Sequence, residues 1–133
     1  MKVFVDVNII MYAAGRTHPW KEPSGQLLER IGRGDVEAVT DTEVLQELLY
    51  RYWHVKDVAH GASLVDYTLG LLSAIFPVHV EDMVAAKTLL TQHPDIEPRD
   101  AMHAAVMLNH GMTQLYSYDR HFDRIPHLTR LEP

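Results

Sequence analysis

The sequence predicts an α/β sandwich with a mainly parallel central sheet, formed by one domain over residues 1–133. Apolar, strand-like runs alternate with amphipathic, helix-like segments, and this order places helices on both faces of a parallel sheet. The first run, residues 3–10, is rich in β-branched residues and has no Pro or Gly, as is typical of a strand buried on both faces. The length suits one domain with a substantial core and is too short for two.

Apolar spacing and capping residues predict the elements of the N-terminal half. Gly15, Gly32 and Gly34 end helices, while Ser24 caps the second helix and Thr40 or Thr42 caps the third. In chain order we expect a strand ending near residue 6, a helix 8–14, a loop 16–23, a helix 24–31, a strand 36–40, a helix from about 42 to 54, and a helix 57–75. The last two helices are expected to form a hairpin.

Prolines, acids and glycines punctuate the C-terminal half. Pro77 marks an edge strand or the start of a strand, Glu81 and Asp82 suit the positive end of a helix dipole, and Gly111 ends a helix. The expected order is a strand 76–80, a helix 81–92, a loop 94–98, a helix 98–110, a strand 114–118, a turn or short helix opened by Asp119, and a strand 129–131.

Composition restricts the function. Twelve Lys and Arg against eighteen Asp and Glu give a net charge of −6, which argues against a broad basic surface that coats nucleic acid. A nuclease remains open, because cations bound to acids reverse the field that a phosphate meets. The absence of Cys excludes disulfides and thiolate chemistry. With no signal-peptide layout and no bilayer-length apolar segment, we expect a soluble cytoplasmic protein that has no membrane partner.

Asp6 is the residue that violates the buried-strand pattern. An unpaired carboxylate in a core costs of the order of 3 kcal/mol or more. In open α/β sheets, ligands lie beyond the carboxyl ends of the strands. Asp6 near the end of the first strand therefore predicts a metal or substrate there.

Three further acids are placed to join Asp6 at the same edge of the sheet. Glu47 lies in the helix after the second strand, Asp100 in the first turn of the helix that begins at Pro98, and Asp119 directly after strand 114–118. Each has an ordinary alternative, as a solvated residue, a helix-terminal charge or a cap. Together they form an oxygen-only ligand set that suits a hard cation, Mg²⁺ or Mn²⁺.

Four motifs in this order resemble the PIN domain and, at this length, the VapC-like toxins of toxin-antitoxin pairs. They are Asp6-Val7-Asn8 after an apolar strand, Val44-Leu45-Gln46-Glu47-Leu48-Leu49, Pro98-Arg99-Asp100-Ala101-Met102-His103-Ala104-Ala105, and Tyr116-Ser117-Tyr118-Asp119-Arg120-His121-Phe122-Asp123. The resemblance covers nearly the whole chain. It implies a three-layer α/β/α sandwich and a metal-dependent endoribonuclease that hydrolyses phosphodiester bonds with one or two ions and no side-chain nucleophile.

The resemblance also implies roles for single residues and for partners. The catalytic and metal-binding acids are Asp6, Glu47, Asp100 and Asp119, assisted by Asn8, Ser117 and Asp123. Val7 departs from the family, which commonly has Ser or Thr there. Glu43 competes with Glu47 one helical turn away, although the Leu-x-Glu-Leu-Leu match favours Glu47. The expected partners are an RNA substrate, a small antitoxin and a second copy of the chain.

Other conspicuous residues have weaker interpretations. His103 shares a helical face with Asp100 and is either a metal ligand or a packed or surface histidine. The arginines that can hold an RNA backbone are Arg16, Arg51, Arg99, Arg120 and Arg124. The aromatic group Tyr50, Tyr52, Trp53 and Tyr67, like Met107 and Met112, is expected in the core, with some of it available as a partner surface.

Two other functional classes compete with the nuclease. A haloacid-dehalogenase-like phosphatase or a receiver domain also has an acid after its first strand. The phosphatase needs a second acid where this chain has Asn8. Both classes need a Lys after a later strand, and no Lys follows Ser117. A degenerate PIN domain that only binds RNA or protein is the non-enzymatic alternative, but such a module has no reason to keep a costly acidic cluster.

Overall fold

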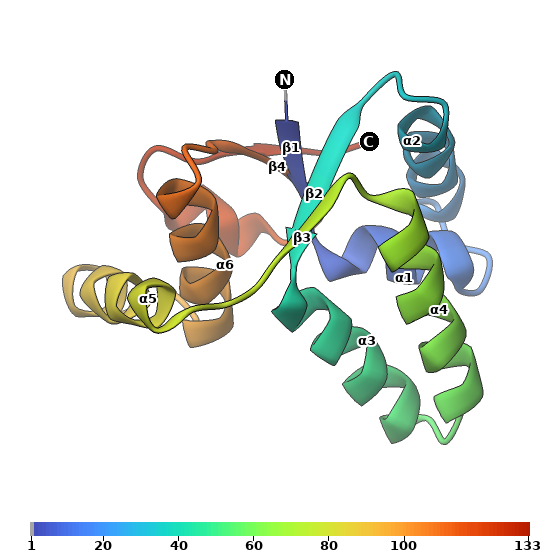
Figure 1. Cartoon of the computed structure of the whole chain (residues 1–133), viewed down its shortest axis with the longest axis horizontal. Helices are drawn as coiled ribbons and strands as arrows, with labels where there is room; N and C mark the ends of the chain where they lie inside the picture. The colour runs from blue at the N-terminus through green and yellow to red at the C-terminus, as the bar shows by residue number, and fades with distance from the viewer. Residues whose placement is uncertain (1) are drawn as a thin grey trace.

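The computed structural model describes residues 2–133 and confirms the predicted α/β sandwich (Figure 1). Five strands form one sheet in the order β3-β2-β1-β4-β5, and all neighbouring pairs are parallel. The elements are β1 (Lys2–Val5), α1 (Val7–Ala14), α2 (Lys21–Gly32), β2 (Glu37–Asp41), α3 (Thr42–His54), α4 (Val58–Leu71), β3 (Ala74–Phe76), α5 (Val80–Gln92), α6 (Pro98–Asn109), β4 (Gln114–Tyr116), the 3₁₀ helix η1 (Arg120–Arg124) and β5 (Thr129–Leu131).

Strand β1 lies in the middle of the sheet and separates two apolar clusters. Successive side chains of a strand point to opposite faces. Phe4 therefore joins the cluster formed with α3, α5 and α6, whereas Val3 and Val5 join the cluster formed with α1 and α2. Figure 1 shows the pairs α5–α6 and α1–α2 on opposite sides of the sheet. Burial on both faces explains why β1 is continuously apolar.

The boundary between α4 and β3 differs from the prediction. The expected helix 57–75 ends at Leu71, and the expected strand 76–80 is instead the three-residue strand Ala74–Phe76. Pro77 follows this strand, and the backbone N–H of Val78 donates to the Thr42 hydroxyl instead of joining the sheet. Helix α5 begins at Val80, with His79 as its N-cap. Among residues 2–133, none of the helices combines the length and apolar character that a bilayer crossing requires.

Two helix starts also differ from the prediction. Helix α2 begins at Lys21, three residues before Ser24, because Pro23 is tolerated in a first turn where its missing N–H is not needed. The N-cap of α3 is Asp41, not Thr40 or Thr42, and its carboxylate accepts the Val44 N–H at 3.1 Å. Ser24 is instead fully buried inside α2.

Helices α3 and α4 form the expected hairpin, which extends beyond the carboxyl edge of the sheet (Figure 1). The prediction that its aromatic residues lie in the core was wrong for Tyr50, Trp53 and Tyr67, which are 57%, 63% and 45% exposed. Only Tyr52 of this group packs against the core. Met107 and Met112 are buried as predicted. The hairpin therefore leaves a largely apolar surface open to solvent.

Gly61 allows the close approach of α4 to α3. A Cβ at this position would lie 2.8 Å from Cβ of Tyr52, so we expect Gly61→Ala to lower the free energy of unfolding by about 1–3 kcal/mol. A Cβ added at Gly70, on the same helix, would meet no atom within 4 Å. Gly70→Ala should therefore raise stability by up to about 1 kcal/mol. Urea unfolding of both variants tests this, and equal effects would contradict the close packing.

Candidate active site

Asp6 lies at the centre of the carboxyl edge of the sheet. It follows β1 directly and caps α1, where its Oδ1 accepts the Val7 N–H at 2.8 Å. Its Oδ2 accepts the Ser117 hydroxyl at 2.6 Å and the Asn8 amide at 3.2 Å. Only 5% of Asp6 is exposed. The strand thus ends on a buried carboxylate whose orientation is determined by three donors.

Ser117 and Asn8 connect Asp6 to the end of β4. The Ser117 Oγ accepts the Asn8 amide at 3.1 Å and the Asp119 N–H at 3.0 Å. The Asn8 Oδ1 accepts the Tyr118 N–H at 3.2 Å. Val7 has no side-chain hydroxyl and supplies its backbone N–H to Asp6. Through these bonds the segment after β4 is held beside the end of β1.

Asp100 and Asp119 form the second part of the site, together with His121. Pro98 begins α6 and places Asp100 in its first turn, and Asp119 caps η1 by accepting the His121 N–H at 2.9 Å. One ligand atom from each of Asp100, Asp119 and His121 lies within 4.8 Å of the others. Asp100 is 6% exposed, and its Oδ2 is buried without a hydrogen-bond partner. Such an orphaned oxygen is rare in proteins and calls for a ligand.

Glu47 and His103 form a separate group with Asp6. A carboxylate oxygen of Asp6, one of Glu47 and a ring nitrogen of His103 lie within 4.8 Å of one another. His103 is one helical turn after Asp100 on α6 and is 1% exposed. Its Nε2 donates to Glu47 Oε1 at 3.0 Å, and its Nδ1 donates to Asp41 Oδ2 at 2.6 Å. Both ring nitrogens are therefore engaged by carboxylates.

Burial and mutual repulsion disfavour the charged forms of these acids. Burial raises the pKa of Asp6, even though His103 and Ser117 favour its charged form. Burial also raises the pKa of Glu47 against the effect of His103. Burial and the charges of Asp119 and Asp6 raise the pKa of Asp100 to about 7 from an ordinary 3.8. For His103, burial lowers the pKa, but the hydrogen bonds to Asp41 and Glu47 outweigh it and hold the pKa well above 6.5.

The residues present fit a hard divalent cation. The unpartnered Asp100 Oδ2 and the surplus of buried carboxylates are what a bound cation satisfies. Oxygen donors suit Mg²⁺ or Mn²⁺ more than softer metals. The acids that could hold it are Asp6 and Glu47 in one group and Asp100 and Asp119 in the other. The elevated pKa of Asp100 is a further sign of a functional centre.

The four acids that the sequence singled out fall into two groups, Asp6 with Glu47 and Asp100 with Asp119. Asn8 and Ser117 hydrogen-bond to Asp6. Glu47 rather than Glu43 lies beside Asp6. The Asp123 side chain is 55% exposed and pairs with Arg130 at 3.0 Å. It belongs to neither of the two acid groups found among residues 2–133.

Sequence reasoning missed Asp41. Its signal was nonetheless present, because Asp41 ends β2 and caps α3 much as Asp6 follows β1 and caps α1.

A cleft of about 1470 Å³ adjoins the site. Asn8 and Glu47 contribute to its wall, which continues over α1 and the α3–α4 hairpin with Tyr12 and Tyr50. Three of the five candidate arginines also line it: Arg16, Arg51 and Arg99. An elongated ligand in this cleft would meet apolar and basic side chains and reach Glu47, one of the four acids.

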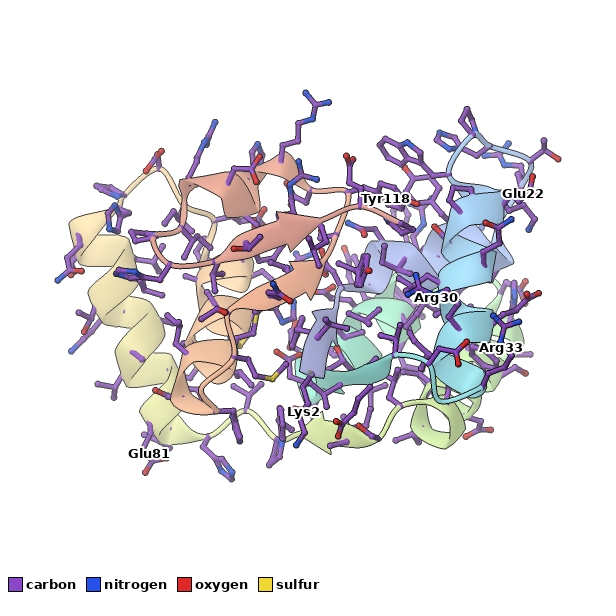
Figure 2. All side chains as sticks on the ribbon, turned by 90° about the horizontal axis from the view of Figure 1, so that it is seen from above. Lys2, Glu22, Arg30, Arg33, Glu81 and Tyr118 are labelled. Carbon is purple, nitrogen blue, oxygen red and sulfur yellow. The ribbon has the colours of Figure 1, made fainter. Side chains whose placement is uncertain are left out.

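An aromatic cluster supports the segment that carries Asp119. Tyr118 stacks on Trp20 with ring centroids 4.2 Å apart, and Tyr12 packs edge-on against both. The Tyr118 hydroxyl and the buried Ser24 hydroxyl are 2.8 Å apart, which joins this segment to α2. Figure 2 shows Tyr118 beside the N-terminal half of α2. The cluster holds the strand-to-η1 connection, and hence Asp119, in one place.

The chain is similar to known ribonucleases over nearly its whole length. Ribonuclease VapC13 of Mycobacterium tuberculosis is 38% identical over 129 residues, which are 97% of this chain and 98% of that protein. Ribonuclease VapC23 of the same organism is 37% identical over 120 residues, 88% and 92% of the two chains.

Solved structures share the fold at lower identity. VapC20 of Mycobacterium tuberculosis, described as a sarcin-ricin loop cleaving toxin, has a TM-score of 0.82 and 18% identity over 98% of this chain and 99% of that one. VapBC2 from Rickettsia felis, bound to a DNA fragment from its promoter, has a TM-score of 0.77 and 24% identity over 99% and 98%. A family model of the PIN domain matches residues 3–128. The chain therefore belongs to the PIN domain family and, within it, to the VapC-like group.

Proposed function

We propose that this protein is a metal-dependent endoribonuclease and the cytoplasmic toxin of a VapBC-type toxin-antitoxin pair. The observation that carries the proposal is the buried acid cluster at the carboxyl edge of the sheet, with an unpartnered oxygen on Asp100. The proposal is supported by the similarity of this chain to a VapC ribonuclease, to which it is 38% identical over 97% of its own length.

The acids would hold Mg²⁺ or Mn²⁺, with Asp6 as the central ligand and Glu47, Asp100 and Asp119 around it. When bound, the cation would activate water and stabilise negative charge on the scissile phosphate. Asn8 and Ser117 hold the Asp6 carboxylate in one orientation through their hydrogen bonds to Oδ2. No Ser, Thr or Cys nucleophile is required, and the chain contains no Cys.

The cleft beside the acids is the proposed path of the RNA. Arg16, Arg51 and Arg99 line it and are exposed, so they are placed to contact phosphates on either side of the scissile bond. Of the other candidates, Arg124 pairs with Asp95 at 3.8 Å. Arg99 also pairs with Glu47 at 3.6 Å. Arginines gathered in one cleft can guide a polyanion even though the net charge of the chain is −6.

The exposed apolar side of the α3–α4 hairpin is the proposed contact for a small antitoxin. Tyr50 and Val55 line the cleft itself, while Trp53 and Val58 lie on the same hairpin and are more than half exposed. Structures of related toxins include VapBC complexes, such as the one from Rickettsia felis. An antitoxin segment in this cleft would exclude RNA from the acids. We also propose that the protein forms a homodimer.

Removal of divalent metal tests the enzymatic part of the proposal. The protein, purified free of any antitoxin, should cleave RNA when Mg²⁺ or Mn²⁺ is supplied and should stop when EDTA is added, because the acids without a cation repel the phosphate. The measurement is the rate at which a labelled structured RNA is cut, followed on a gel. Re-addition of Mg²⁺ in excess over EDTA is the control and should restore cleavage.

The same assay separates the alternatives. Activity that persists in EDTA would contradict a metal-dependent mechanism. RNA that is bound but never cut with either metal would favour a degenerate PIN domain acting as a binding module. For the toxin role, a small upstream reading frame should encode a protein that co-purifies with this chain and blocks cleavage.

A further inference from the structure

His103 is a buried polar side chain that the proposed mechanism does not use. It lies between two carboxylates that come from different parts of α3: Asp41 at the N-cap and Glu47 in the second turn. The two hydrogen bonds, 2.6 Å to Asp41 and 3.0 Å to Glu47, occupy both ring nitrogens. With 1% exposure, the imidazole has no access to solvent in which to find other partners.

The Asp41 side of this bridge is rigid. Asp41 is the last residue of β2, is fully buried, and uses its other oxygen to accept the Val44 N–H at 3.1 Å. The His103 ring also packs against Phe4 of β1, with ring centroids 5.5 Å apart. Strand β1, strand β2 and helix α6 therefore all contribute to the position of one imidazole.

The Glu47 side is the adjustable one. A glutamate has three side-chain torsions, and the only other cation paired with Glu47 among the described residues is Arg99, which lies 3.6 Å away and is 54% exposed. Without His103, Glu47 has no buried partner that determines where its carboxylate points.

We propose that His103 is a positioning residue, which ties the Glu47 carboxylate to Asp41 so that Glu47 lies within reach of a cation held by Asp6. This inference rests on the proposed metal site. It differs from a role of His103 as a ligand, because a ring nitrogen turned toward the cation would leave a buried carboxylate of Asp41 or Glu47 without its donor.

A double-mutant cycle on Mn²⁺ binding tests the inference. The proteins are the wild type, His103→Gln, Glu47→Gln and the double variant, and the measurement is the Mn²⁺ dissociation constant from calorimetry and from the free-ion EPR signal. Loss of a residue that orients a ligand weakens metal binding about 10- to 100-fold. If His103 acts through Glu47, each single variant should show such a loss, and the double variant should bind no more weakly than Glu47→Gln alone.

The controls separate positioning from folding. His110→Gln changes a histidine at the end of the same helix, outside both acid groups, and should bind Mn²⁺ as the wild type does. Far-UV CD establishes that each variant is folded. If His103→Gln does not fold, Asp41→Asn replaces it in the cycle, since an asparagine still caps α3 but no longer draws the imidazole by charge.

A folded His103→Gln variant that binds Mn²⁺ with wild-type affinity would overturn the inference. So would a double variant whose loss of Mn²⁺ affinity is the sum of the losses in the two single variants. The proposed metal site requires that the wild type binds Mn²⁺ and that Asp6→Asn loses this binding. If either result fails, the metal site is wrong and the inference falls with it.

Discussion

Asp6→Asn is expected to lower the rate of RNA cleavage at least about 100-fold while leaving the fold intact. The substitution removes the central charge of the acid cluster. An asparagine still caps α1, because its Oδ1 can accept the Val7 N–H as Asp6 does. Asp6 is also a buried acid whose pKa burial raises, so its neutral replacement relieves a desolvation penalty in the metal-free protein. The variant also gives up the bonds that Oδ2 accepts from Ser117 and Asn8, so we expect the loss of activity to appear in a protein that remains folded.

The measurement pairs single-turnover cleavage at saturating Mg²⁺ with thermal unfolding in EDTA. Asp66→Asn is the matched control, because Asp66 is an exposed residue of α4 outside both acid groups. It should change neither quantity appreciably. Cleavage by Asp6→Asn within a few fold of the wild type would contradict a metal site centred on Asp6, whatever the stability shows.

The architecture could be predicted from the sequence because the strand pattern and the helical spacing of apolar residues are both strong in this chain. Strand β1 and the helices packed on either side of it bury continuous or regularly spaced apolar residues, so period and burial agree. The grouping of Asp6 with another acid was predictable for a related reason: Asp6 stands out against apolar neighbours, and parallel strands end at one edge.

Short elements and contacts between distant segments were not predictable in the same way. Strand β3 has three residues, too few for a periodicity, and it closely follows a helix of similar apolar character. The aromatic residues of α3 were expected in the core because their helical spacing does not show whether a neighbouring element covers them. The bridge from Asp41 through His103 to Glu47 joins residues 62 and 56 positions apart, and only the fold brings them together.

The metal-free protein is expected to lose stability as the pH rises from about 4 to about 7. The pKa of Asp100 is about 7 in the folded protein and near 3.8 in the unfolded chain, so between these values the folded state holds a proton that the unfolded state has released. Stability from this group is full below about pH 4 and is lost as the pH passes through 7. The difference between the two pKa values corresponds to about 4 kcal/mol.

Asp100→Asn isolates this contribution. In EDTA, the variant should match the wild type near pH 4 and exceed it by a few kcal/mol at pH 8, as measured by urea unfolding across the range. Asp66→Asn is again the exposed control and should follow the wild-type profile. Saturating Mg²⁺ should reduce the wild-type loss, because a cation favours the charged acids and binds the folded state.

An unchanged slope in Asp100→Asn would show that another group carries the pH dependence. A wild-type profile that is the same with and without Mg²⁺ would separate Asp100 from metal binding altogether. The expected pattern links the two, because the buried, unpartnered Asp100 Oδ2 that destabilises the metal-free protein at neutral pH is the same oxygen that a cation would satisfy. Protons and metal then compete for Asp100, and cleavage at limiting Mg²⁺ should fall as the pH drops below about 7.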